Sequence, residues 1–290
     1  MDKSLIVAAH EFKTNLKRKE YLLFAFVVPA FLLFCALVVS FVGNRVTLSQ
    51  LLEMQTRQAF FAFPSTIAMV FSMAIFLSAN FLLQSISTEK ENRIMEVLMS
   101  TISFRQLLTG KILGLGMLGL VQFASWVSIG LIMFAMASPQ AIGTEAFTIA
   151  TITKIALYLV FFMLGYLLYA ALLAAIGALT ETKMEAQQIS SVVTIFSLIP
   201  ALCTLFLNEE GDLVFGTVLT LFPLTAPITT IIRVFLEKIT MPEILASGAM
   251  LVFSTIVVIA VATRLFRAEI LMYGKKFSPR QLMRFIVQGR

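Results

Sequence analysis

Residues 87–111, STEKENRIMEVLMSTISFRQLLTGK, form the longest polar interval between two strongly apolar runs of the chain. Thr88 and Glu91 have the spacing of a capping box, which predicts that a helix opens at this point. The pattern predicts a short amphipathic helix presented to a soluble partner; a solvated loop with one helical turn is the alternative. The available chemistry is charge-assisted hydrogen bonding. The charged candidates are Glu89, Lys90, Glu91, Arg93 and Glu96, and the apolar face holds Ile94, Val97, Leu98 and Ile102.

The rest of the sequence offers little catalytic chemistry. Its single histidine, His10, lies in a charged N-terminal segment, and we interpret it as a solvated surface residue. The sequence contains no H-E-x-x-H or G-x-S-x-G motif and no pair of intramembrane aspartates. Gly110-Lys111 lacks the upstream glycine and the following Ser or Thr of a phosphate-binding loop. We therefore expect no catalytic residue, no metal site and no cofactor on this chain.

The elements that must position these residues are membrane-spanning helices. The chain has 290 residues, 59% of them hydrophobic and 13% charged, with a mean hydropathy of +0.94. Soluble domains carry about a quarter charged residues, so the composition predicts an all-α integral membrane protein with a single transmembrane domain. An interfacial helix over residues 1–20 and a cytoplasmic tail over residues 267–290 flank the spans. The six predicted spans are residues 21–42, 60–86, 112–136, 155–179, 189–207 and 244–266.

Residues 213–236, between the last two spans, are apolar but are interrupted by Pro223, Pro227 and Arg233. Two prolines four residues apart argue against one straight helix, so we predict a re-entrant hairpin of two short helices that enters from the outer face. Arg233 is then expected near the outer head groups or over an acidic cluster. A snorkelling arginine on an interfacial helix is the alternative. The nearest acidic residues in sequence are Glu209, Glu210 and Asp212.

The basic residues test this topology. With the N-terminus inside, 17 lysines and arginines fall in cytoplasmic segments and 5 on the outer side, as the positive-inside rule requires. Both termini are therefore predicted to be cytoplasmic. The net charge of +6 then reflects membrane topology, and nucleic acid is not an expected partner.

Three segments together resemble the type 2 ATP-binding-cassette transporter permeases, most closely the branch similar to sodium-efflux permeases. The run EKENRIMEVL at 89–98, followed by Gly110-Lys111, is similar to the cytoplasmic signature of that family. FPLTAPITTIIR at 222–233 looks like its re-entrant hairpin, and RLFRAEILMYGKK at 264–276 is the third match. Phe104 stands where many relatives have proline. The connection at 43–59 is shorter than the outer domain of classical sodium-efflux permeases.

This resemblance implies an elbow helix over residues 1–20 and a coupling helix within residues 87–104. It also implies a dimer with a second permease copy or homologue, and two separate ATPase subunits that carry ATP and Mg. The implied location is the plasma membrane of a prokaryote, among membrane lipids. By the resemblance, the residues that couple to the ATPase are Glu89, Lys90, Glu91, Arg93, Glu96, Val97 and Leu98.

The substrate is less constrained by the sequence. No acid or base lies deep in a span, and the apolar lining favours outward transport of an amphipathic or lipid-like substrate. Sodium efflux and a non-transporting membrane regulator are the alternatives. Pro223, Pro227 and Arg233 form the predicted outer gate. Candidates for the substrate path, each also suited to bonding between helices, are Asn80, Gln84, Gln122, Tyr166 and Tyr169; a second ATPase contact, or a solvated turn, is predicted at Glu181, Lys183 and Glu185.

Overall fold

The computed structural model describes residues 3–27, 29–31, 34, 71–92, 94–137, 149–180, 182–203 and 213–271. The regular structure within these ranges is helical and includes no strand. The chain begins with α1 (Lys3–Leu16), α2 (Lys19–Leu22) and the π-helical segment Leu23–Val27. The later helices are Phe71–Glu91, α5 (Ile94–Thr101), α6 (Phe104–Ala137), α7 (Ile149–Leu179), α8 (Lys183–Leu202), α10 (Leu213–Leu221), α11 (Ala226–Phe235) and α12 (Met241–Leu271).

Four helices in the described part of the chain are long and apolar enough to cross a membrane: Phe71–Glu91, Gln106–Ile129, Ile152–Leu179 and Met241–Thr263. They overlap the second, third, fourth and sixth predicted spans, which confirms an all-helical, multi-pass membrane protein. α8 covers most of the predicted fifth span, but glutamine and serine side chains in its first half lower its hydropathy. Half of the predicted first span, 21–42, and most of the tail at 267–290 lie outside the described residues. The count of six therefore stays a prediction.

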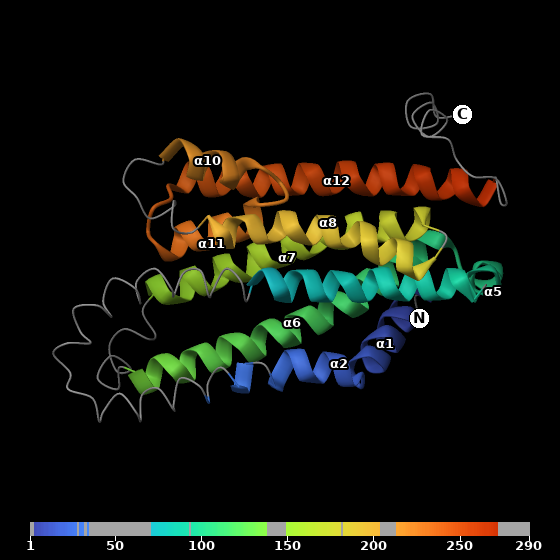
Figure 1. The fold of residues 1–290 in the computed structure, drawn as a ribbon, viewed down its shortest axis with the longest axis horizontal. Coiled ribbons are helices and arrows are strands. Elements are labelled where there is room, and N and C mark those ends of the chain that lie inside the picture. The colour runs from blue at the N-terminus through green and yellow to red at the C-terminus, as the bar shows by residue number, and fades with distance from the viewer. Residues whose placement is uncertain are drawn as a thin grey trace.

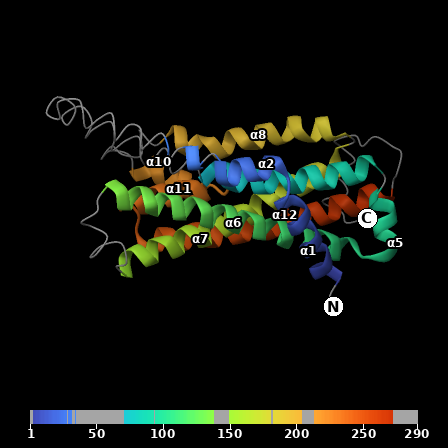
Figure 2. The same cartoon turned by 90° about the horizontal axis from the view of Figure 1, so that it is seen from below.

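The long helices lie side by side with their axes roughly parallel (Figure 1). α5, the start of α1 and the start of α8 lie at one end of this bundle. α10 and α11 lie at the opposite end (Figures 1 and 2). The predicted cytoplasmic segments and the predicted outer hairpin are thus separated by the length of the spans.

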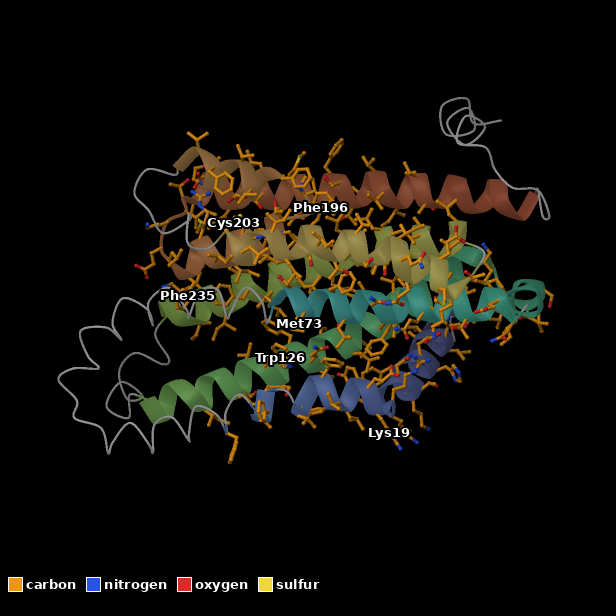
Figure 3. The ribbon with its side chains drawn as sticks, viewed as in Figure 1. Lys19, Met73, Trp126, Phe196, Cys203 and Phe235 are labelled. Carbon is orange, nitrogen blue, oxygen red and sulfur yellow. The ribbon has the colours of Figure 1, made fainter. Side chains whose placement is uncertain are left out.

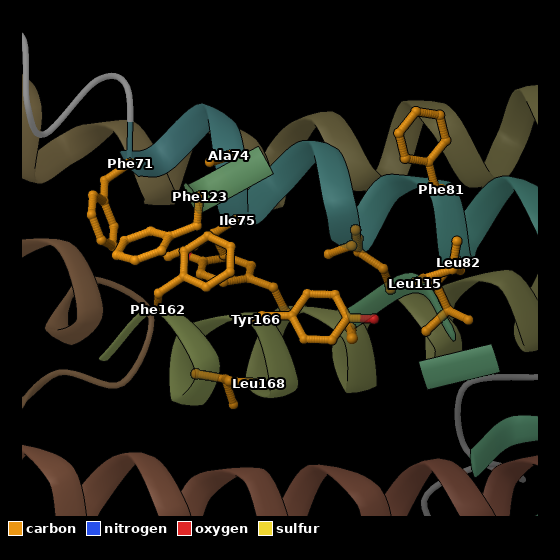
Figure 4. Close-up of a cluster of buried hydrophobic side chains, with 14 of the residues drawn as sticks. Phe71, Ala74, Ile75, Phe81, Leu82, Leu115, Phe123, Phe162, Tyr166 and Leu168 are labelled. Carbon is orange, nitrogen blue, oxygen red and sulfur yellow. The ribbon is translucent and has the colours of Figure 1, made fainter. Parts of the chain in front are cut away.

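Aromatic rings hold the middle of the bundle together (Figure 4). Phe71 meets Phe123 of α6 edge-on at 5.6 Å between ring centroids and Phe162 of α7 edge-on at 5.8 Å. Phe123 and Phe162 lie 5.2 Å apart. Such edge-to-face pairs stabilise by about 0.5–1.5 kcal/mol each beyond the burial of their area. Three spans are therefore joined at one buried point.

Glycines on α6 allow α1 to pack closely against it. A Cβ atom on Gly110 would lie 2.6 Å from the carbonyl oxygen of Ser4, and one on Gly114 would lie 2.5 Å from that of Ala8. Both distances are too short for a real side chain, so this contact needs glycine at both positions. Small residues four apart commonly let two helices approach in this way in membranes. The face of α1 that becomes buried carries Ala8, Glu11 and Asn15.

The capping-box prediction at Thr88 and Glu91 is wrong. The helix that starts at Phe71 runs on through Thr88 to Glu91, and the Thr88 carbonyl accepts a hydrogen bond from the Asn92 amide at 3.1 Å, one helical turn later. The apolar run before Thr88 propagates the helix past the capping signal, because each added residue gains one more backbone bond. The amphipathic helix is instead α5, and α6 starts at Phe104, earlier than the predicted span at 112.

The proline segment forms two short helices rather than one, as predicted. α10 ends at Leu221, Pro223 lies in the turn, and Pro227 lies in the first turn of α11, where a missing amide donor costs nothing. α11 is buried from Ala226 to Val234. Gly165 of α7 lets Pro227 approach, since a Cβ there would lie 2.8 Å from the proline ring. Whether this hairpin enters the membrane stays a prediction.

Candidate functional site

α5 projects from one end of the bundle (Figure 1), and part of its apolar face is exposed. Val97 is 70% exposed and Ile94 is 47% exposed, whereas Leu98 and Ile102 are half-buried. Of the predicted apolar face, Ile94 and Val97 are therefore uncovered, whereas Leu98 and Ile102 are partly covered. Glu91 is also exposed. Arg93 and the side chain of Glu96 lie outside the described residues.

Two lysines tie the α5 region to its neighbours. The Lys3 amine on α1 donates to the Thr101 carbonyl at the end of α5, at 2.8 Å. Lys90 donates to the carbonyl oxygens of Ala178 and Thr180, at 2.6 and 2.8 Å. These carbonyls belong to the C-terminal end of α7, where a helix lacks internal donors and its dipole favours a cation. Lys90 therefore acts as a brace between two spans, a role beyond contact with a partner.

Lys111 is the centre of a buried polar cluster that joins α1, the helix Phe71–Glu91 and α6. Its side chain is 1% exposed and its amine donates to a carboxylate oxygen of Glu11, to the Ser85 hydroxyl at 2.6 Å and to Glu89 at 2.7 Å. Ser85 donates in turn to Glu11 at 3.1 Å. The Asn15 amide nitrogen donates to the second oxygen of Glu11 at 2.9 Å. All three protons of the amine are thus used.

The charge balance in this cluster is two carboxylates to one ammonium. Burial alone would raise the pKa of Glu11, but the charge of Lys111 and the hydrogen bonds from Lys111, Ser85 and Asn15 together hold that pKa below its ordinary value. Glu89 keeps a side-chain exposure of 20% and so retains some contact with solvent. The sequence placed Glu89 on a surface for a partner; the structure turns one of its oxygens to Lys111.

The predicted second contact segment lies at the start of α8. Thr182 caps this helix, because its hydroxyl accepts from the Glu185 amide at 3.2 Å. Lys183 and Glu185 are exposed, and Ala186 between them and the bundle is buried. Glu181 lies outside the described residues. The segment is therefore a surface helix start at the same end as α5.

The polar residues predicted for a substrate path divide into two groups. The Tyr166 hydroxyl donates to the Ile112 carbonyl at 2.9 Å, and Tyr169 donates to the Leu224 carbonyl at 2.5 Å. Both tyrosines are therefore used to join helices. Asn80 and Gln122 are buried, and the amide oxygen of each accepts no hydrogen bond within the described part of the structure. Gln84 is half-buried, about two turns before the end of the helix Phe71–Glu91.

At the opposite end, Arg233 is 4% exposed and pairs with Glu243. Its guanidinium donates to the Thr220 hydroxyl at 2.9 Å and to both Glu243 oxygens at 3.3 Å. Glu243 also accepts from the Thr240 amide at 2.9 Å. The acidic partner is thus Glu243 on α12, which the sequence did not single out; Glu209, Glu210 and Asp212 lie outside the described residues. This bridge links α11 to α10 and α12.

Glu11, Lys111 and Glu243 are the polar residues that the sequence analysis missed as contact groups. A lone lysine at the start of an apolar run was a usable signal, because a buried cation requires a partner. Within the described ranges, no group of three or more His, Cys, Asp or Glu is placed to hold a metal ion.

The comparison with known proteins identifies relatives along most of the chain. Residues 44–264 match a family model described as ABC-2 family transporter protein. The chain is 29% identical to the uncharacterized protein MJ1024 of Methanocaldococcus jannaschii over 219 residues, which are 74% of this chain and 51% of that protein. It is 28% identical to the uncharacterized protein YhaP of Bacillus subtilis over 211 residues, 71% of this chain and 50% of that protein. The chain spans about half the length of the curated relatives it matches.

Proposed function

Because this chain belongs to the ABC-2 family of transporter proteins, we propose that it is the permease subunit of an ATP-binding-cassette exporter. The family supplies the membrane part of such transporters and is not itself a hydrolase. ATP and Mg would therefore be bound by a separate ATPase subunit, present in two copies under a dimer of this chain or of this chain with a homologue.

The observation that carries this proposal is the exposed apolar face of α5, which Lys3 holds to α1 and whose preceding helix Lys90 holds to α7. Ile94 and Val97 offer a small apolar contact, and Glu91 beside them offers a charge. Apolar side chains in water at the tip of a helix gain free energy only when a partner covers them. A cleft in the ATPase subunit is the partner that the family implies. α5 is then the coupling helix.

The contacts of three lysines determine which helices would move together with α5. Lys3 links α5 to α1, Lys90 links the preceding helix to α7, and Lys111 joins that helix to α1 and α6. Buried ion pairs and closely packed helices do not stretch, so a displacement of α5 carries these helices as a unit. We propose that ATP binding and hydrolysis move the bundle in this way. α1 then acts as the elbow helix, with its exposed Leu5 and Ile6 in the membrane interface.

The proposed topology has six spans, both termini in the cytoplasm and the α5 end facing the ATPase. The relatives from an archaeon and a bacterium support a prokaryotic plasma membrane as the location. The α10–α11 hairpin would be the re-entrant gate at the outer end, with Pro223 and Pro227 shaping its turn and Arg233 holding it to α12. Arg233→Ala should then change the ATPase rate of the reconstituted complex at normal expression; an unchanged rate would remove the gate role.

The proposed cargo is amphipathic or lipid-like and moves outward. Asn80 and Gln122 remain the best path candidates, since the buried amide oxygen of each has no hydrogen-bond partner within the described part of the structure. Sodium is the alternative cargo for a permease of the same architecture. ATPase stimulation of the reconstituted complex by a panel of lipids and by sodium separates the two, because the transported species alone is expected to raise the rate.

The coupling proposal is tested by site-specific crosslinking in cells. A photoreactive amino acid in place of Val97 should crosslink this chain to an ATP-binding-cassette ATPase that mass spectrometry identifies. The matched control is Phe253 on α12, which is 62% exposed but faces the membrane in this topology, so it should crosslink to lipid or to a second permease. Crosslinking of the ATPase from Phe253 and not from Val97 would contradict the proposal. If Val97 crosslinks to the ATPase but the complex transports nothing, the chain would instead be a non-transporting membrane regulator.

A further inference from the structure

A basic cavity of about 400 Å³ lies between α2, the end of the helix Phe71–Glu91 and the start of α8. It is on the same end of the bundle as α5. Figure 3 shows Lys19 on α2 at the edge of the bundle. The residues that line the cavity are Arg18, Lys19, Glu20, Gln84, Thr88 and Lys183. Three separate stretches of the chain therefore contribute to one concave polar surface.

The lining carries three cations and one carboxylate, a net charge of +2. Within the part of the chain that the structure describes, Arg18, Lys19 and Lys183 make no ion pair. The first turn of α8, which begins at Lys183, adds the positive end of a 20-residue helix. Thr88 and Gln84 supply a hydroxyl and an amide for further hydrogen bonds. These groups suit a phosphate or a similar anion.

Along α2, the π-helical segment and α8, the surface becomes more apolar with distance from the cavity. Beyond Arg18, Lys19 and Glu20, the exposed side chains of α2 and the π-helical segment are Leu22, Leu23, Phe26 and Val27. Beyond Lys183, the exposed side chains of α8 include Met184, Ile189 and Val192, with the polar Glu185, Gln187 and Gln188 among them. A ligand with an anionic head and a hydrocarbon chain matches this sequence of charged and then apolar surface. A soluble anion would use only the charged part.

We propose that this cavity binds the anionic head group of a phospholipid from the cytoplasmic leaflet. The inference rests on the proposed function in one respect, the orientation that puts the α5 end at the cytoplasmic face. Basic pockets between transmembrane helices on that face are suited to anionic head groups, because the leaflet itself is anionic. The cavity then either holds a resident lipid or receives the head group of a lipid cargo. In both cases the ligand is the same phosphate-headed lipid.

The test uses the full chain alone, without ATPase or ATP, by native mass spectrometry and lipid titration in detergent micelles. Phosphatidylglycerol should bind and phosphatidylcholine, which is zwitterionic, should bind far less. Arg18→Gln/Lys19→Gln/Lys183→Gln should weaken phosphatidylglycerol binding roughly a hundredfold, because each basic residue near an anionic surface contributes about fivefold. Lys19→Arg/Lys183→Arg should retain binding. Glycerol phosphate, which has no acyl chain, should bind weakly.

A control variant separates the cavity from general charge. Lys13→Gln/Lys17→Gln/Lys238→Gln removes the same charge from exposed positions that do not line the cavity, so it should leave lipid binding unchanged. Equal loss in the control and cavity variants would overturn the proposal, as would full binding by the cavity variant or equal binding of phosphatidylcholine. Glycerol phosphate binding as tightly as the lipid would identify a soluble-anion site and also overturn it. Because no ATPase is present, these outcomes are independent of the crosslinking test of coupling.

Discussion

Replacing Lys111 by methionine tests whether the buried polar cluster holds the α5 end of the bundle together. Methionine keeps an unbranched side chain of similar length and removes only the charge and the three donors. The change leaves Glu11 and Glu89, with side-chain exposures of 10% and 20%, facing a site that no longer holds a cation. Removing one partner of a buried ion pair costs about 3–5 kcal/mol. Since Glu89 can regain some water, we expect the lower end, about 3 kcal/mol.

For a chain of this length, a loss of about 3 kcal/mol corresponds to a fall of roughly 5 °C in the unfolding midpoint. The single tryptophan, Trp126 on α6, reports unfolding by its fluorescence in lipid nanodiscs. The control is Lys111→Met/Glu11→Gln/Glu89→Gln, which removes the uncompensated charges together with the lysine. It should recover most of the loss, because a buried charge cluster replaced as a whole is close to neutral. An unchanged midpoint in the single variant, or a triple variant as unstable as the single, would refute the reasoning.

Three further outcomes follow from the same contacts. Because the pKa of Glu11 is lower in the folded state, its contribution to stability is present above the ordinary Glu pKa of about 4.3 and is lost as the pH falls through the folded value; thermal midpoints from pH 7 to 3 should therefore fall less in Glu11→Gln than in the native chain. Gly114→Ala should cost about 1–3 kcal/mol by forcing α1 away from α6, whereas Gly248→Ala, whose Cβ would meet nothing within 4 Å, should not lower the midpoint, because alanine favours a helix more than glycine does. Tyr169→Phe should cost about 1 kcal/mol through one lost hydrogen bond, and in the reconstituted complex it should lower the transport achieved per ATP hydrolysed; unchanged coupling would exclude the contact from the mechanism.

Long apolar runs predicted the existence of the long helices, because crossing the hydrocarbon core requires about 20 consecutive apolar residues. The predicted spans at 112–136 and 155–179 lie within α6 and α7. Helix ends were predicted less well, as at Thr88, because a capping pattern competes with the propagation of an apolar helix. The proline turn at Pro223 was predictable because proline acts on its own backbone and that of the preceding residue.

The polar contacts could not be predicted from local pattern. Lys111 finds Glu11 at a separation of 100 residues and Glu89 at 22. Lys90 finds its carbonyls 88 and 90 residues away. The residues next to a charged side chain in sequence do not specify which distant helix it will contact. The charged residues of the central stretch were therefore read as one surface, whereas the fold turns Glu89 and Lys90 inward and leaves Glu91 outside.

α7 is held at its C-terminal end and near its middle by contacts that link it to other parts of the bundle. Lys90 holds the carbonyls at the end of α7, while Tyr169 and Gly165 on the same helix hold the α10–α11 turn through Leu224 and Pro227. A helix transmits an axial displacement with little compression because its backbone hydrogen bonds lie along the axis. A movement applied at α5 must therefore either break the bonds to Lys90 or shift α7, and a shift of α7 reaches the hairpin through a buried hydroxyl and a proline ring. Physical continuity of this kind becomes evidence of coupling only when its removal uncouples the two ends. Tyr169→Phe makes that test at the contact with the smallest change in packing, because it deletes one oxygen atom and leaves the ring in place.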